Sequence, residues 1–253
     1  NLAAALSTIE AIDIGKLYAA IASAAPQMSI HIAGALTNAS PEKADQLVDW
    51  ITSEYPDQFT NIVVAIANAM PDNGIDLMEL AAENMVDEYP TELLEMTEKY
   101  ITNLSDSLDA MRPVDRVAAA SKNTATELYN RLTDVSPEQS TELAFTVSES
   151  LPESSNDVAE AYVQNLIDSE SQSEQVFSQG ALENIEYSAN NYVNHMVDNI
   201  PEHAVDVAST FVDSFPEVAS DMLEILQDSD DIKDSELTTS IDDKPLQNIV
   251  EQQ

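Results

Sequence analysis

Three histidines are the side chains of this sequence that most readily take part in chemistry: His31, His195 and His203. An imidazole can ligate a metal or act as a general base near neutral pH. Two metal-binding histidines on one helix are typically four residues apart, often as H-E-x-x-H. None of the three has such a partner in the sequence. We therefore interpret them as partly exposed helix residues and predict no metal centre.

Carboxylates are far more numerous, with 47 Asp and Glu against 9 Lys and Arg and a net charge of −38. Carboxylate oxygens are the ligands that calcium prefers. A calcium loop of the EF-hand type starting at Asp228 would need Gly at its sixth position and Glu at its twelfth, where this chain has Lys233 and Thr239. The sequence therefore argues against an EF-hand, and loosely bound Ca²⁺ at carboxylate clusters stays an open alternative.

The usual signatures of enzymes are missing from the sequence. It has no Gly-rich phosphate loop, no serine nucleophile elbow and no dinucleotide fingerprint. It also has no cysteine, which excludes disulfides, iron–sulfur clusters and covalently attached haem. Pairs of carboxylates arise by chance among so many acids, so they do not indicate acid–base catalysis. We expect no enzymatic activity, no catalytic residue and no cofactor.

The charge is unevenly distributed, since residues 132–232 contain 22 Asp or Glu and no Lys or Arg. Phosphate recognition needs basic side chains, so nucleic acid is not an expected partner. The acidity also disfavours binding to an anionic membrane surface, and no apolar stretch is long enough to span a bilayer. Two interpretations remain: a solvated face that keeps the protein soluble at high salt, or a surface for divalent cations or a basic partner.

Proline recurs every fifteen residues and defines an internal repeat. The prolines in this spacing are Pro26, Pro41, Pro56 and Pro71, then Pro137 and Pro152, then Pro201 and Pro216. Proline suits the first position of a helix, and the residue before it is disfavoured there. The pattern predicts that each proline ends one helix and begins the next, with Ser40 and Ser136 as side-chain caps.

Apolar residues keep a constant offset from these prolines. Positions +6, +10 and +14 are apolar in the units that follow Pro41, Pro56, Pro137 and Pro201. Steps of three and four residues place them on one face of an α-helix. The register slips near 85–90, 113–122 and 167–170, which we interpret as longer helices or loop insertions.

The predicted fold class is all-α: an α-solenoid of about fourteen short helices with a roughly fifteen-residue repeat, followed by an extended C-terminal tail. Short helices are marginal alone and must stack, as in repeat proteins. We predict one helical repeat domain over residues 1–227 and an acidic, extended or mobile tail over 228–253, where the repeat stops.

Candidate contact residues lie at the two ends of the repeat and at its single tryptophan. The first segment presents an apolar face with Leu2, Leu6 and Ile9, and the tail ends in a small apolar patch of Leu246, Ile249 and Val250. This patch is expected to dock on a neighbouring subunit or to fold back near Met222 and Leu226. Trp50, at position +9, departs from the apolar face and is expected to be exposed.

The units that end Ala-Ala-Pro26, Ala-Ser-Pro41 and Ala-Met-Pro71 resemble the Ala-rich, proline-punctuated short helical repeats of some secreted or surface-associated bacterial proteins. The resemblance implies an extracellular or cell-surface structural role. We expect a non-catalytic, self-assembling subunit of a filament, surface layer or matrix, forming a homo-oligomer through its ends and tail. The alternative is a monomeric acidic solenoid adaptor that binds a basic peptide or protein.

Overall fold

A computed structural model describes residues 13–55, 58–86, 89–109, 114–170, 179–229 and 232, with side chains left out at 105–121 and 170. All regular structure in these residues is helical: twelve α-helices and five short 3₁₀ turns, with no strand. The all-α prediction is therefore confirmed for the described part of the chain. Of the first expected helix, predicted over Asn1 to Ile14, residues 1–12 lie outside it, as does most of the predicted tail.

The chain divides into two compact units, residues 1–138 and 139–253. The helices of the first unit are α2 (Ile14–Ala24), α3 (Ser29–Ala39), α4 (Ala44–Glu54), α5 (Phe59–Ala69), α6 (Gly74–Met85), α7 (Pro90–Asp109) and α8 (Val114–Val135). Those of the second are α9 (Ser140–Ser150), α10 (Ser155–Glu170), α11 (Gln179–Asn199), α12 (Pro201–Ser214) and α13 (Ala219–Asp228). The register slip near 113–122 falls within the long helix α8.

Each proline joint has the same backbone structure. In five of the described joints the proline opens a three-residue 3₁₀ turn: η1 (Pro26–Met28), η2 (Pro41–Lys43), η3 (Pro137–Gln139), η4 (Pro152–Ser154) and η5 (Pro216–Val218). An eleven-residue α-helix follows η1 and η2 directly. The helix of eleven residues, one non-helical residue and the three-residue turn together account for the fifteen-residue period. Only α7 and α12 begin at the proline itself, so the predicted start of the α-helix is three residues early elsewhere.

The residue before the proline satisfies the backbone on both sides of the joint. Leu151 donates its N–H to the Val147 carbonyl at 3.0 Å, and its own carbonyl accepts the Ser154 N–H at 2.8 Å. The same two bonds flank Pro26, Pro41, Pro201 and Pro216. Backbone groups therefore do the capping, and the predicted cap by Ser40 is wrong: its hydroxyl is buried with no hydrogen-bond partner among the described residues.

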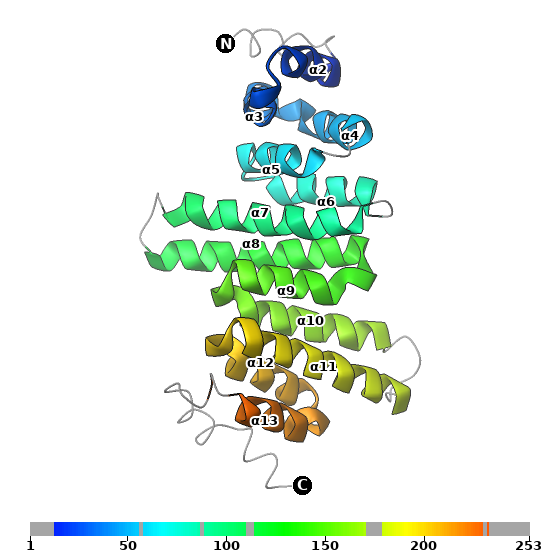
Figure 1. Cartoon of the computed structure of the whole chain (residues 1–253), viewed down its shortest axis with the longest axis vertical. Coiled ribbons are helices and arrows are strands. Elements are labelled where there is room, and N and C mark those ends of the chain that lie inside the picture. Colours follow the sequence, from blue (N-terminus) through cyan, green and yellow to red (C-terminus); the bar gives the residue numbers. More distant parts are fainter. Residues whose placement is uncertain are drawn as a thin grey trace. The chain divides into compact units, whose positions relative to one another are not determined.

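Within each unit a helix packs on its neighbour and on the next helix but one. In the first unit α3 packs on α5 and α5 on α7, while α4 packs on α6 and α6 on α8. In the second unit α9 packs on α11, α10 on α12 and α11 on α13. Figure 1 shows α3 and α5 on one side of the first unit and α4 and α6 on the other. Helices that pack sequentially in this way form two rows.

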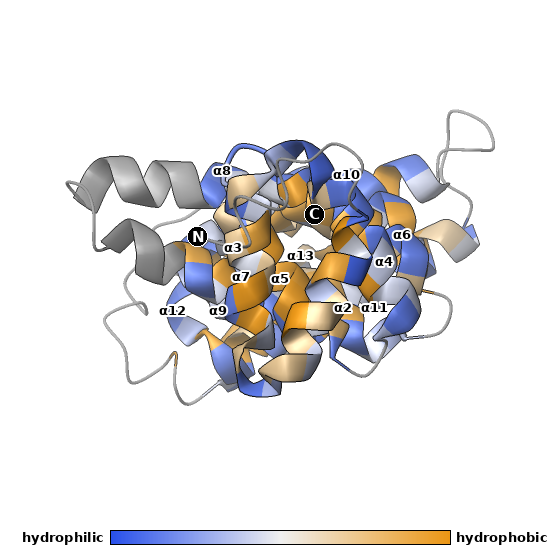
Figure 2. Cartoon of the chain, turned by 90° about the horizontal axis from the view of Figure 1, so that it is seen from above, coloured by the Kyte–Doolittle hydropathy of each residue, from blue (hydrophilic) through white to orange (hydrophobic). Residues whose placement is uncertain are grey.

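Two rows require a wider apolar face than the sequence pattern indicated. Positions +6 and +10 are buried as predicted, for example Leu47, Ile51, Leu143 and Val147, each with no exposed area. Positions +7 and +11 are buried as well, because a second helix covers them. Helix α5, with neighbours on several sides, is apolar along most of its length (Figure 2).

Position +11 carries buried hydroxyls in several units, a feature that the sequence analysis missed. Thr37 and Thr52 are buried there, and their hydroxyls donate to the carbonyls of Ala33 and Val48, each at 3.0 Å. Thr97 in α7 makes the same bond to Leu93 at 2.8 Å. A hydroxyl that bonds to the preceding turn of its own helix can be buried at little cost. These threonines therefore pack as core residues.

Candidate functional site

The predicted contact residues divide into one that the structure describes and six that it does not. Leu2, Leu6, Ile9, Leu246, Ile249 and Val250 lie outside the described residues. Trp50 is half-buried, since its ring packs against Gly15 and makes ring contacts with Tyr18 and Tyr55 at centroid distances of 5.9 and 5.3 Å. Its main role in this structure is packing between α2 and α4.

The lysine and arginine side chains that the structure describes all belong to the first unit. Lys16 pairs with Asp13 at 3.0 Å, and Lys99 contacts Glu95 and, at 2.8 Å, the amide oxygen of Asn61. Arg131 of α8 reaches Glu79 of α6 at 2.7 Å. In the second unit the described residues contain no Lys or Arg. Its carboxylates therefore have no Lys or Arg of their own unit among these residues, and the imidazole of His195 is the basic group that lies next to one of them, Glu149.

A groove between α11 and α13 gathers several of these carboxylates. It has a volume of about 480 Å³, and Val197 and Ile225 contribute apolar surface to it. The polar lining residues are Asn190, Asn194, Asp198, Asp221, Glu224, Asp228 and Ser229. Four carboxylates thus line a cavity together with aliphatic side chains. This combination suits a ligand that is both cationic and partly apolar.

Two carboxyl groups face each other beside this groove. The hydrogen bond to Asp221 raises the pKa of Glu186 above its usual value, and the negative charges of Asp221 and Glu183 raise it further. The Asn190 amide donates to Asp221 Oδ2 at 3.5 Å, while Asn190 Oδ1 is buried with no hydrogen-bond partner among the described residues. A carboxyl pKa raised by a neighbouring carboxyl indicates concentrated negative charge at this place.

The face of α11 that lines the groove also carries an exposed aromatic ring. Tyr187 is 74% exposed, whereas most aromatic side chains described in this unit are buried. It lies three residues before Asn190 and seven before Asn194, which places the three residues on one face of the helix. The helix face that lines the groove therefore continues toward the N-terminal end of α11, where it carries the aromatic ring of Tyr187.

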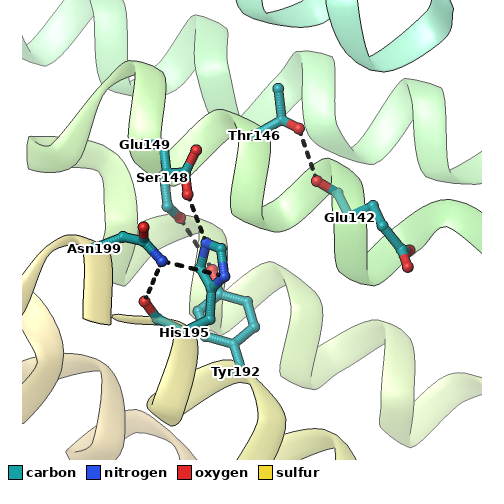
Figure 3. A network of polar contacts seen from close by, with 7 residues as sticks. All are labelled: Glu142, Thr146, Ser148, Glu149, Tyr192, His195 and Asn199. Atoms are coloured by element: carbon teal, nitrogen blue, oxygen red, sulfur yellow. Dashed lines mark hydrogen bonds and ion pairs between the residues drawn. The ribbon is translucent and has the colours of Figure 1, made fainter. Parts of the chain in front are cut away.

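His195, also on α11, belongs to a different network (Figure 3). Its ring stacks on Phe145 at 3.8 Å, and its Nε2 lies 2.8 Å from Glu149 Oε1 of α9, close enough for an ion pair when the imidazole is protonated. The neighbouring Tyr192 and Ser148 share a buried hydrogen bond of 3.0 Å. These contacts join α9 to α11. They resemble a packing contact between the two helices.

His31 is exposed on α3, and His203 is half-buried near the start of α12. Among the described residues, no three His, Asp or Glu side chains are placed so that they could hold a metal ion. The helices that the structure describes include none that is both long and apolar enough to cross a bilayer. The described part of the chain therefore offers one candidate site with a cavity and concentrated charge, the groove between α11 and α13.

Sequence reasoning located the acidic region of this site but not the groove. The absence of Lys and Arg from residues 132–232 was the signal for the region. The juxtaposition of Asn190 with Asp221 depends on α11 packing against α13, a tertiary contact over about thirty residues that no local spacing reveals. Comparisons with protein-family models, curated proteins and solved structures find no match for this chain, so its function has to be argued from this chemistry.

Proposed function

We propose that this chain is a non-catalytic α-solenoid binding protein whose second unit recognises a basic protein or peptide. The observation that supports it most directly is the charge of the second unit, in which no described Lys or Arg compensates the carboxylates. Acidic surfaces attract basic partners over long distances and speed their association. A helical repeat adds an extended surface on which a partner segment can lie.

The fifteen-residue repeat, with a proline joint in each period, supports the solenoid assignment within each unit. Helices that contact their neighbour and the next but one form two rows, the arrangement in which a repeat protein buries a continuous core. We propose that each unit is a short solenoid built from this joint.

Self-assembly into a filament, surface layer or matrix remains a second proposal, together with an extracellular or cell-surface location. It rests on the sequence of the two ends. A structural observation compatible with it is the exposure of Met28 and Ile30 on the first unit, at 47% and 42%. Exposed apolar side chains at neighbouring positions are candidates for contacts between copies.

Binding and light-scattering measurements on the full chain test the two proposals separately. Fluorescence anisotropy with a labelled Lys- and Arg-rich peptide should show binding that weakens as salt is raised, because the attraction is electrostatic. An Asp- and Glu-rich peptide of equal length is the control. Failure of the basic peptide to bind at low salt would remove the adaptor proposal. Light scattering that finds only monomers would remove the self-assembly proposal.

A further inference from the structure

We propose that the groove between α11 and α13 is a binding site for an arginine side chain carried by a basic peptide segment. This inference rests on the function proposed above and makes it specific, since it names one groove and one side-chain chemistry. The four carboxylates of the lining are Asp198, Asp221, Glu224 and Asp228. The occupant has to match their charge and also the apolar surface between them.

Arginine fits both parts of the lining. Its aliphatic stem can lie along apolar surface while its charged head stays in a polar environment. Val197, which is 8% exposed, and the half-buried Ile225 provide that surface between α11 and α13. The planar guanidinium can form paired hydrogen bonds with carboxylates, whereas the ammonium of lysine acts as a point charge. The groove therefore favours arginine over lysine.

The volume of the groove indicates more than one isolated side chain. Cavities of a few hundred Å³ accommodate small ligands that are largely enclosed, and this groove of about 480 Å³ is open at the surface. The exposed Asn194 lies among the lining residues, and a carboxamide both donates and accepts hydrogen bonds. It can pair with the peptide backbone that flanks the arginine.

The carboxyl groups next to the groove concentrate negative charge, and the positive charge of a guanidinium would offset it. The hydrogen bond with Asp221 and the negative charge of Asp221 raise the pKa of Glu186, which places these two acidic groups close together. Asn190 beside them keeps a buried carboxamide oxygen without a described partner. A guanidinium has five N–H donors and no acceptor. It can therefore supply donors to a site that has an excess of acceptors.

Tyr187 provides a second contact of the same chemistry. Its ring is 74% exposed and lies on the face of α11 that continues into the groove. A cation above a tyrosine ring is attracted by the ring electrons, and arginine forms such contacts more often than lysine. The aromatic ring and the carboxylates thus favour the same occupant, a peptide with at least one arginine.

A divalent cation fits the groove less well. No three carboxylate or imidazole groups among the described residues are placed to hold a metal ion. The aliphatic floor and the exposed ring add nothing to metal coordination, since Ca²⁺ is bound by oxygen ligands only. Calcium binding is therefore an outcome that the experiment has to distinguish.

The test compares three labelled peptides that differ only in one residue type: an Arg-rich peptide, the same peptide with Lys, and the same peptide with citrulline, which keeps the shape of arginine without its charge. The full chain should bind the arginine peptide more tightly than the lysine peptide and the citrulline peptide weakly. Equal affinity for the Arg and Lys peptides would overturn the assignment to arginine.

The location of binding is tested with two double variants of equal charge. Asp221→Asn with Glu224→Gln neutralises the groove, whereas Glu153→Gln with Glu160→Gln neutralises two exposed carboxylates elsewhere in the unit. The groove variant should lose about tenfold in affinity and the control about twofold or less, because only close pairs contribute strongly. Equal losses would overturn the groove and leave the acidic-surface proposal intact. No binding by the wild-type chain would overturn both.

Two further measurements complete the test. Tyr187→Ala should weaken binding severalfold while Tyr187→Phe retains it, and this exposed residue carries little risk to folding. Titration with Ca²⁺ at constant ionic strength should displace the peptide no better than Na⁺. Strong displacement by Ca²⁺ that the groove variant abolishes would overturn the proposal in favour of a cation site.

Discussion

The two units of this chain share one construction and differ in how they connect their helices. In the first unit two of the links between next-but-one helices use basic side chains: Lys99 to Asn61 between α7 and α5, and Arg131 to Glu79 between α8 and α6. In the second unit described links are Ser148 to Tyr192 and Asn156 to Thr210, at 3.0 and 2.7 Å. The same helix pairing is thus compatible with surfaces that differ in how far their acidic charge is offset by lysine and arginine.

This difference shows that the residues that build the fold are distinct from the residues that set the charge of the surface. Proline joints and the buried positions +6 and +10 recur in both units, while the described Asp, Glu, Lys and Arg residues are partly or fully exposed except for the buried Lys43. The first unit neutralises part of its charge with its own lysines and arginine. The second unit keeps its charge, which is the physical basis for assigning partner binding to it.

The largest expected effect tests whether both units depend on the same buried positions of the repeat, such as +6 and +10. Ile62→Asp in the first unit and Val147→Asp in the second each bury a carboxylate without a partner, since the wild-type side chains are 1% and 0% exposed. Each should lower the free energy of unfolding by at least about 3 kcal/mol. Thermal and denaturant unfolding monitored by circular dichroism measures this loss.

Matched controls for these substitutions lie on the same or an adjacent helix. Asn68→Asp in α5 and Asn191→Asp in α11 add the same charge at exposed positions and should change stability by about 0.5 kcal/mol or less. If Ile62→Asp were no more damaging than Asn68→Asp, position +6 would not belong to the core and the repeat would have to be redefined.

The next effect tests the close helix contacts of the first unit. A Cβ atom on Gly74 would lie 2.4 Å from the Tyr100 hydroxyl and 2.9 Å from the Ala67 carbonyl oxygen. Gly74→Ala should therefore destabilise the unit by about 1–3 kcal/mol through overpacking. Gly34→Ala is the control, because its nearest neighbour, the Ala65 carbonyl oxygen, is at 3.6 Å and alanine favours the helix. The two melting temperatures should move in opposite directions.

A smaller effect compares the two kinds of link directly. Tyr192→Phe removes a buried hydrogen bond and leaves Ser148 without that partner, so it should cost about 1–3 kcal/mol at any salt concentration. Arg131→Gln removes an ion pair whose arginine side chain is 41% exposed, which should cost about 1 kcal/mol or less and vanish at high salt. Equal costs and equal salt dependence would remove the distinction between the units.

Much of this architecture could be predicted from the sequence because it is encoded locally. Proline determines where one helix ends and the next begins, and helical geometry places positions +6 and +10 on one buried face. The 3₁₀ turn after the proline was missed, although it is closed by local backbone hydrogen bonds. The burial of Thr37 and Thr52 at +11 was also not predicted, since it depends on how a second row of helices covers the first. The groove was not predicted for the same reason. Its residues lie on α11 and α13, and only tertiary packing brings them together.

Salt should stabilise the second unit more than the first. Repulsion between carboxylates is screened by added ions, and the second unit has no described Lys or Arg to offset it. We expect the melting temperature of the second unit to rise with NaCl concentration by more than that of the first. Site-resolved hydrogen exchange at low and high salt measures both units in one chain. A larger salt effect on α3 to α7 than on α9 to α13 would contradict this comparison.

The smallest expected effect concerns the carboxyl pair beside the groove. The pKa of Glu186 is raised by its hydrogen bond with Asp221, so the folded chain binds this proton more tightly than the unfolded chain does. The resulting stabilisation is fully present below the pKa of the unfolded state and is lost as the pH rises through the raised pKa. Glu186→Gln should therefore behave like the wild type in acid and be slightly more stable than it at pH 7. The melting temperature of both proteins, followed from acidic to neutral pH, measures the difference, and Glu160→Gln reports the effect of removing a charge elsewhere in the unit. A difference between Glu186→Gln and the wild type that does not grow with pH would show that the pKa of Glu186 is not raised, and would remove this support for a guanidinium site.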